Sequence, residues 1–254
     1  MKVNVKIIGF TVWAALLVFG YVPVGAYVEQ PVTDGATIHG KVVFKGTAPP
    51  PRSFGLIVYP DMDLCQRISD GKGHRLLRDF AVSMDGGLRD VVVVVEDVKQ
   101  GKPFRLMGPN ITMKDCEFSP FMSVVRDRDN MTFQNKDGII HDIQTYAIED
   151  NKRGDKIFDR AALPDATLTQ EIKVPKGQRI VWTQCGKHSF MQTWSYTVDN
   201  PYYAITADDG TFSIQDLPPG RYHVTAWHPF MKLREQTIDV APKSKVVVNF
   251  EFGK

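Results

Sequence analysis

The feature that most constrains the fold is a series of short β-branched and aromatic runs, each interrupted by a proline or glycine turn. The chain has 16 prolines and 20 glycines. Its apolar runs, such as DVVVVVEDV and VVVNFEF, are far too short to cross a bilayer and are typical of buried strands. The sequence contains no amphipathic helical stretch of convincing length. We therefore predict an all-β architecture built from sandwiches.

The N-terminal segment indicates export. Residues 1–26 carry two lysines, then an apolar run, then the small-residue end Val24-Gly25-Ala26. This order is typical of a secretory signal peptide cleaved after Ala26. The alternative is a retained leader that anchors the chain in a membrane, because the apolar run is near the lower limit of a span. We predict a periplasmic or secreted protein.

Charge and motif content exclude several functions. Removing the leader takes away two lysines and no acids, so the formal charge falls from +2 to zero. We therefore expect no nucleic-acid partner. The sequence shows no Ser-His-Asp set, phosphate-binding loop or His-Glu-x-x-His motif. We predict that the protein is not an enzyme, because no residues are evident that could carry an independent catalytic activity.

Three cysteines allow one internal disulfide in an oxidising compartment and leave one sulfur over. Only Cys185 has soft and borderline ligands nearby, in the order Cys185-x-x-His188-x-x-Met191. We therefore pair Cys65 with Cys116 and leave Cys185 as a thiolate. Three alternatives stay open: a buried and inert Cys185, a pairing that oxidises Cys185, or free thiols at the other two positions.

A second histidine lies upstream in the segment MTFQNKDGIIHDIQTY. This segment predicts a strand ending near Asn135, a turn, and a second strand entered at His141. Monovalent copper prefers sulfur and divalent copper accepts imidazole, so two histidines, a thiolate and a weak methionine suit both states. Zinc would more often recruit a second cysteine or a carboxylate. We predict one mononuclear copper ion that passes single electrons.

The motif CGKHSFM resembles the ligand loop of the small blue copper proteins, the cupredoxins. Its spacing, with Phe190 before the methionine, is similar to amicyanin rather than to the longer plastocyanin loop. The upstream pattern of Met131-Thr132-Phe133, Asn135 and Asp137 matches as well. The resemblance covers roughly residues 104–198 and implies a Greek-key sandwich. The metal ligands that it implies are His141, Cys185 and His188 in the equatorial plane and Met191 as the axial ligand.

One position departs from this pattern. Cupredoxins usually have asparagine directly after the first histidine ligand, whereas this chain has Asp142. A carboxylate cannot donate the amide proton that helps tie the two ligand loops together. We expect a looser connection and a lowered reduction potential if Asp142 is ionised near the metal. Asp142, Asn135 and Phe190 are the predicted supporting residues around the ligands.

The flanking segments have a different pattern. The strand ATIHGKVVF ends at a proline run, and ITADDGTFSIQDLPPGRYHVTAW predicts a hairpin turning at Asp209-Gly210. These pieces resemble carboxypeptidase regulatory-like sandwiches, which are related in shape to transthyretin and immunoglobulin folds. We predict that residues 33–103 and 199–254 form one such sandwich, with the cupredoxin-like domain, 104–198, inserted in it. Two sandwiches in tandem are the alternative.

The order of motifs along the whole chain resembles secreted proteins often labelled methylamine-utilisation or plastocyanin-like. That label does not establish a role in amine metabolism. The leading prediction is a one-electron carrier that exchanges electrons near His188 with a redox protein, such as a cytochrome or an oxidoreductase. The first alternative is a copper storage or delivery protein. The second is an extracytoplasmic structural or docking protein with a vestigial metal site.

Overall fold

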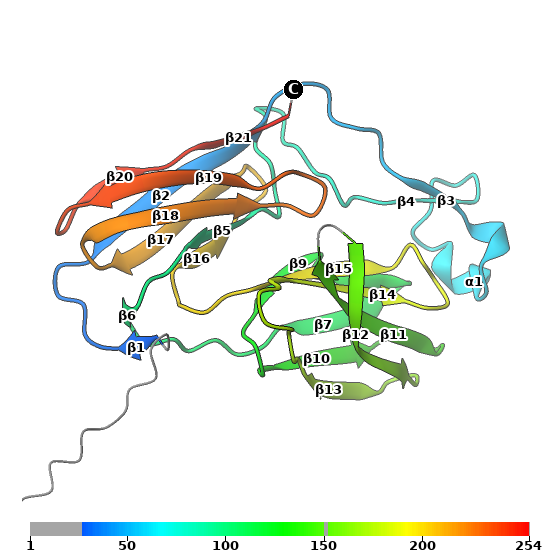
Figure 1. Ribbon diagram of the computed structural model, residues 1–254. Helices are drawn as coiled ribbons and strands as arrows, with labels where there is room; N and C mark the ends of the chain where they lie inside the picture. Colours follow the sequence, from blue (N-terminus) through cyan, green and yellow to red (C-terminus); the bar gives the residue numbers. More distant parts are fainter. Residues whose placement is uncertain (1–26, 150–151, 254) are drawn as a thin grey trace, which may run out of the picture.

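The computed structural model describes residues 27–149 and 152–253, and its regular secondary structure is almost wholly β-strand (Figure 1). Its helical elements, η1 (Leu56–Val58) and α1 (Met62–Cys65), are each about one turn long. The predicted all-β fold class is confirmed. The predicted signal peptide, residues 1–26, lies outside the described residues. Within the described residues, no helix is long and apolar enough to cross a membrane.

The first sandwich consists of two facing sheets with the strand orders β13-β10-β7-β8 and β12-β11-β14-β15-β9. Most neighbours are antiparallel, but β10 with β7 and β15 with β9 are parallel. The strands are β7 (Asn110–Lys114), β8 (Glu117–Ser119), β9 (Met122–Val125), β10 (Asn130–Asn135), β11 (His141–Glu149), β12 (Lys152–Ala162), β13 (Thr167–Glu171), β14 (Ile180–Cys185) and β15 (Gln192–Thr197).

Alternation along these strands decides which side chains reach the core of the first sandwich. In β10, Met131, Phe133 and Asn135 are buried and the residues between them are less so. In β14, the same alternation buries Val181 and Cys185. Because successive side chains of a strand point to opposite faces, each strand ends with a polar or sulfur-bearing residue on its inward face.

The second sandwich combines strands from both ends of the chain. Its sheets have the orders β16-β5-β18-β19 and β17-β2-β20, and β21 also pairs with β2. The strands are β2 (Ala36–Phe44), β5 (Val92–Val95), β16 (Tyr203–Ile205), β17 (Thr211–Leu217), β18 (Gly220–Trp227), β19 (Arg234–Val240), β20 (Lys245–Val247) and β21 (Phe250–Phe252). The short strands β1 (Val28–Glu29) and β6 (Gln100–Gly101) pair with each other in parallel.

These pairings support the nested arrangement of the two predicted domains, since β2 and β5 precede the first sandwich and all their partner strands follow it. The boundaries of those domains stay a prediction. The predicted hairpin at Asp209-Gly210 is wrong. The turn exists, but β16 pairs with β5 and β17 pairs with β2, so it connects the two sheets. An apolar cluster that includes Val94, Tyr196 and Trp227 joins the sandwiches.

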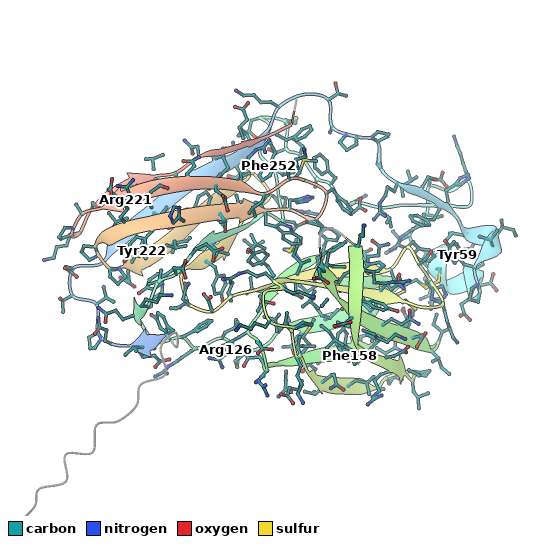
Figure 2. All side chains as sticks on the ribbon, in the orientation of Figure 1. Tyr59, Arg126, Phe158, Arg221, Tyr222 and Phe252 are labelled. Atoms are coloured by element: carbon teal, nitrogen blue, oxygen red, sulfur yellow. A yellow bond between two sulfur atoms is a disulfide. The ribbon has the colours of Figure 1, made fainter. Side chains whose placement is uncertain are left out.

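The segment 53–76, which we call the cap, leaves the second sandwich and folds against the first. It contains β3 (Ser53–Gly55), η1, α1 and β4 (His74–Leu76), with β3 and β4 paired. Leu56 and Cys65 of the cap are fully buried in the core of the first sandwich. In Figure 1 the cap lies beside the ends of β11 and β14, and Figure 2 labels its Tyr59 there. This part of the range 33–103 thus packs with the other sandwich.

Candidate metal centre

The local structure brings the predicted ligands to one end of the first sandwich. Cys185 ends β14, His188 lies in the following turn, and Met191 directly precedes β15. Two backbone hydrogen bonds close this loop: Met191 donates to the His188 carbonyl at 2.8 Å, and Cys185 donates to the Met191 carbonyl at 3.2 Å. His141 begins β11, the strand that pairs with β14.

Three donor atoms converge inside this end of the sandwich. The Sγ atom of Cys185 lies 3.8 Å from Nδ1 of His141 and 3.6 Å from Nδ1 of His188. All three side chains are fully buried, and Met191 is 1% exposed beside them in the same core. The donor atoms of the three residues lie within 4.8 Å of one another. A single small ion could therefore contact all three.

The outer nitrogens of both imidazoles are anchored away from the sulfur. Nε2 of His141 lies 2.9 Å from Oδ2 of the buried Asp137. Nε2 of His188 lies 3.2 Å from the Pro60 carbonyl, which can only accept, and 3.7 Å from an Asp61 carboxylate oxygen. With the proton on each Nε2, both Nδ1 lone pairs point toward Cys185. In this tautomer Nδ1 is the nitrogen that can ligate a metal, and the contact at Nε2 fixes the ring.

The surroundings also favour a thiolate at Cys185. Burial raises the pKa of this thiol. Hydrogen bonds from the His141 and His188 rings, which require a proton on Nδ1 in place of a metal ion, and from the backbone amides of Asp142 and Lys187 outweigh burial and lower the pKa to about 6. Burial likewise lowers the pKa of His141, but Asp137 and Cys185 outweigh it and raise the pKa to about 9. Because the thiolate is the metal-binding form, the site is prepared for a cation.

The predicted supporting residues have distinct contacts. Asn135 is buried, and its side-chain amide donates to the carbonyls of Ile139, Ala162 and Leu163, which fixes the turn before His141. The Phe190 ring packs 5.0 Å from the ring of Tyr59 in the cap.

Position 142 is where the chain differs from the usual cupredoxin pattern. The Asp142 backbone carbonyl accepts a hydrogen bond from the Gly186 amide at 2.7 Å. Its side chain accepts from Gln144 at 2.9 Å. Burial raises the pKa of the Asp142 carboxyl, with a further rise from the nearby Asp159. The main chain therefore ties the two ligand loops together whichever side chain stands at 142, and the effect of the carboxylate on the potential stays a prediction.

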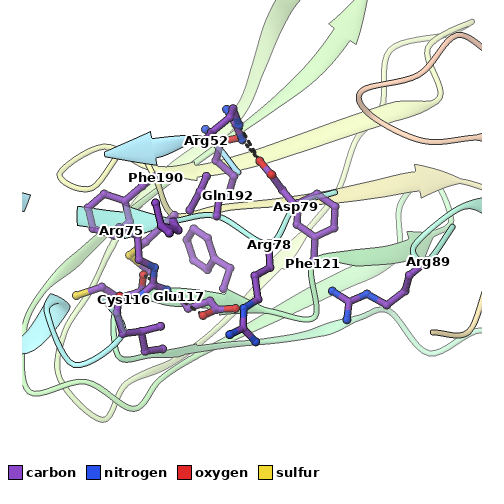
Figure 3. A pocket seen from close by; sticks show the side chains of 15 residues that line it. Arg52, Arg75, Arg78, Asp79, Arg89, Cys116, Glu117, Phe121, Phe190 and Gln192 are labelled. Carbon is purple, nitrogen blue, oxygen red and sulfur yellow. Dashed lines mark hydrogen bonds and ion pairs between the residues drawn. The ribbon is translucent and has the colours of Figure 1, made fainter. Parts of the chain in front are cut away.

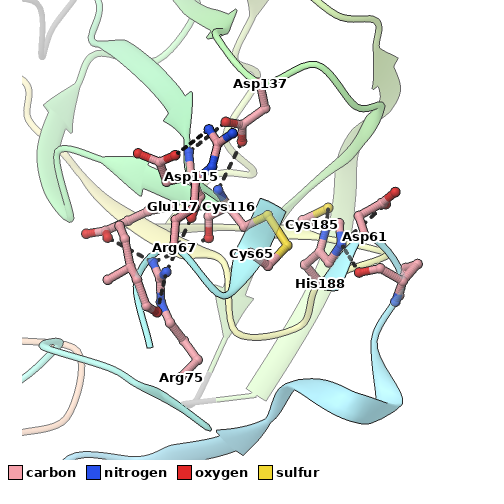
Figure 4. Close-up of a disulfide and its surroundings, with 12 residues drawn as sticks. Asp61, Cys65, Arg67, Arg75, Asp115, Cys116, Glu117, Asp137, Cys185 and His188 are labelled. Carbon is pink, nitrogen blue, oxygen red and sulfur yellow. Dashed lines mark hydrogen bonds and ion pairs between the residues drawn. A yellow bond between two sulfur atoms is a disulfide. The ribbon is translucent and has the colours of Figure 1, made fainter. Parts of the chain in front are cut away.

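The predicted disulfide between Cys65 and Cys116 is confirmed, and Cys185 is a free, buried cysteine (Figure 4). The bond joins α1 of the cap to the turn between β7 and β8. Its sulfurs and a ring nitrogen of His188 lie within 4.8 Å of one another. A disulfide of this kind indicates an extracytoplasmic protein.

Sequence reasoning missed three residues that support the histidines: Asp137, Pro60 and Asp61. The sequence placed Asp137 in the turn and in the upstream cupredoxin-like pattern but gave it no role toward His141, although its spacing of four residues before His141 is a usable signal. Pro60 and Asp61 are separated from His188 by about half of the sequence, and no local sequence pattern predicts their contact with it.

The cluster of His141, Cys185, His188 and Met191 resembles a type 1 copper site. The donor chemistry fits: two imidazoles whose Nδ1 atoms face the sulfur, one thiolate and one thioether in a water-excluded core. The absence of a second nearby reduced thiol and of a carboxylate aimed at the sulfur distinguishes the described cluster from most zinc sites.

Comparison with known proteins gives one family match. Residues 169–248 match the family model described as polysaccharide lyase family 4, domain II. This match covers less than half of the chain, so it does not assign the protein to that family. No curated protein matches the sequence.

Several solved structures are similar to part of the chain. A purple cupredoxin from Nitrosopumilus maritimus is 15% identical, over 35% of this chain and 99% of its own, with a TM-score of 0.29. Amicyanin from Paracoccus versutus is 9% identical, over 42% and 97%, with a TM-score of 0.30. A copper-containing nitrite reductase from Thermus scotoductus is 14% identical, over 39% and only 24%, with a TM-score of 0.30. These TM-scores are too low for the similarity to support an argument. The candidate metal centre therefore rests on its own geometry.

Proposed function

We propose that the protein binds one copper ion through His141, Cys185 and His188, with Met191 as a weak fourth ligand, and carries single electrons outside the cytoplasm. The observation that carries this proposal is the convergence of both Nδ1 atoms on the Cys185 sulfur while both Nε2 atoms are held outward. Copper would supply the one-electron redox couple. The chain itself supplies a fixed set of soft and borderline donors in a dry core.

The burial of the donors favours a carrier over a storage or delivery protein. Delivery requires an ion that leaves readily, whereas these three side chains are fully buried. The cap covers His188, and the Cys65–Cys116 disulfide fastens the cap to the sandwich. The same rigidity lets the donor set stay in place when the charge of the ion changes, which keeps the rearrangement small.

The proposed redox partner, a cytochrome or an oxidoreductase, would approach the cap. The sequence suggested an electron route at the edge of His188, but this ring is fully buried. Its Nε2 donates to the carbonyl of Pro60, and Pro60 lies at the surface of the cap. A hydrogen bond of 3.2 Å therefore connects the imidazole to the protein surface. The supporting role of Asp142, Asn135 and Phe190 is part of the same proposal.

Copper retention in both oxidation states tests the carrier role. The protein, loaded with divalent copper, is reduced with ascorbate, desalted, and its copper content is measured by mass spectrometry before and after. We expect one copper per chain in both states and a reversible wave in voltammetry. Loss of the metal on reduction would indicate a delivery protein rather than an electron carrier. Absence of the metal in both states would reject copper binding.

A further inference from the structure

A cavity of about 350 Å³ lies between the cap and the first sandwich, next to the candidate metal centre (Figure 3). Its walls come from residues 75–79, at and just beyond the end of the cap, from Cys116 to Phe118, and from the loop segment Phe190 to Gln192. A volume of about 300–1,000 Å³ is usual for sites that bind small molecules. The cavity is therefore large enough for a ligand with one ring.

The charge lining this cavity is positive. Four arginines contribute to it against two carboxylates, Asp79 and Glu117. The Arg52 guanidinium pairs with Asp79, and Arg75 pairs with Glu117 at 2.9 Å. The other two arginines are Arg78 and Arg89, which Figure 3 shows near Phe121.

Of these two arginines, Arg89 already has carboxylate partners, whereas Arg78 has none among the described residues. The ion pairs of Arg89 are with Asp90 and Asp208, neither of which lines the cavity. Among the described residues, Arg78 has no side-chain hydrogen bond or ion pair, and it is exposed. A planar guanidinium presents parallel N–H groups that match a carboxylate with two hydrogen bonds.

The apolar part of the lining is rigid. Phe118, Phe190 and Met191 are almost wholly buried beneath it, and Phe121 is its partly exposed aromatic ring. Arg75 is also buried and is fixed by the Ile68 carbonyl at 3.0 Å and by Glu117, while its guanidinium lies 5.8 Å from the centre of the Phe190 ring. The cavity thus combines one unpaired arginine, Arg78, with the partly exposed ring of Phe121, which suits a small flat molecule with an acidic end.

We propose that this cavity binds a small aromatic carboxylate, with the acid held by Arg78 and the ring packed against Phe121. Neither residue of this contact is a predicted copper ligand, and Met191, which contributes to the lining, is buried beneath it. Binding therefore does not depend on the proposed metal.

The test is calorimetric titration of the full chain, as purified, with benzoate, benzamide and inorganic phosphate. Benzamide has the same shape as benzoate without the charge, and phosphate has charge without a ring. We expect benzoate to bind about tenfold tighter than either, because both the charge-assisted hydrogen bonds and the ring burial are then realised. Heat is measured rather than colour, so the result is independent of copper content.

Variants assign the site. Arg78→Gln removes an exposed cation with no partner in the described fold, and we expect it to weaken benzoate binding about tenfold while leaving benzamide unchanged. Arg105→Gln, at another exposed arginine outside the cavity, is the control and should leave benzoate binding unchanged. Equal affinities for benzoate and benzamide, tighter binding of phosphate, or an unaffected Arg78→Gln variant would each overturn the proposal.

Discussion

Replacing Asp137 by asparagine perturbs the buried contact that orients His141. The carboxylate is nearly fully buried and accepts three hydrogen bonds. Oδ2 accepts from His141 Nε2 at 2.9 Å and from the Cys116 amide at 3.0 Å, and Oδ1 accepts from the Asp115 amide at 2.6 Å. Asparagine has a single oxygen, so its NH₂ group must face one of these donors.

Both orientations of the new amide are unfavourable. If the oxygen stays toward His141, the Asp115 amide loses its acceptor, which costs about 1–3 kcal/mol of unfolding free energy. If the amide turns, His141 must take its proton on Nδ1, the atom that faces Cys185. The loss of this oriented acceptor then lowers copper affinity by about 10–100-fold, as is typical when the partner of a metal-bound histidine is removed.

The assay has two parts. Copper affinity is measured by competition with a coloured chelator, and the unfolding free energy of the metal-free protein is measured by urea denaturation. Asp155→Asn is the control, because Asp155 is exposed and has no ion pair among the described residues. If Asp137→Asn matched the wild type in both measurements, the role assigned to Asp137 would be refuted.

Three further predictions address the second sandwich, the cap and the departing residue. Burial lowers the pKa of His228 to about 4, below the value of about 6.5 in an unfolded chain, so the unfolded state takes up this proton first. The unfolding free energy should therefore fall by about 3 kcal/mol as the pH decreases from about 6.5 to about 4. Urea denaturation at several pH values should show a smaller fall for His228→Leu than for the wild type. An identical pH profile for the two proteins would contradict the assignment to His228. Replacing both Cys65 and Cys116 by serine should cost about 2–5 kcal/mol of unfolding free energy and accelerate copper loss to a chelator, whereas unchanged loss would show that the cap does not retain the metal. Asp142→Asn should raise the midpoint potential in voltammetry, because it removes a negative charge that favours divalent copper, and an unchanged potential would exclude Asp142 from tuning the site.

The part of the site that the sequence predicts is the part encoded locally. The strand ending at Cys185, the turn with His188 and the strand starting after Met191 follow from alternation and turn residues over a short segment. His141 was found in the same way, at the start of its strand. The expected disulfide followed from elimination, because only one cysteine had metal-binding neighbours.

The cap could not be predicted, because its position depends on contacts between distant segments. Pro60 and His188 are 128 residues apart, and neither the strand pattern nor the composition of 53–76 indicates which sandwich it joins. The turn at Asp209-Gly210 shows a related limit. Its residues encode the reversal of the chain, but the flanking strands do not pair with each other. Strand β16 pairs with β5 and strand β17 pairs with β2, which lie in different sheets.

The visible absorption spectrum of the copper-loaded protein tests the central claim most directly. Divalent copper bound by a cysteine thiolate and two histidines should give a strong band near roughly 600 nm, which bleaches with ascorbate and is absent from Cys185→Ser. This result would establish that the thiolate at Cys185 binds the ion. A copper-loaded protein without that band, or an unchanged band in the Cys185→Ser variant, would contradict the proposed copper centre.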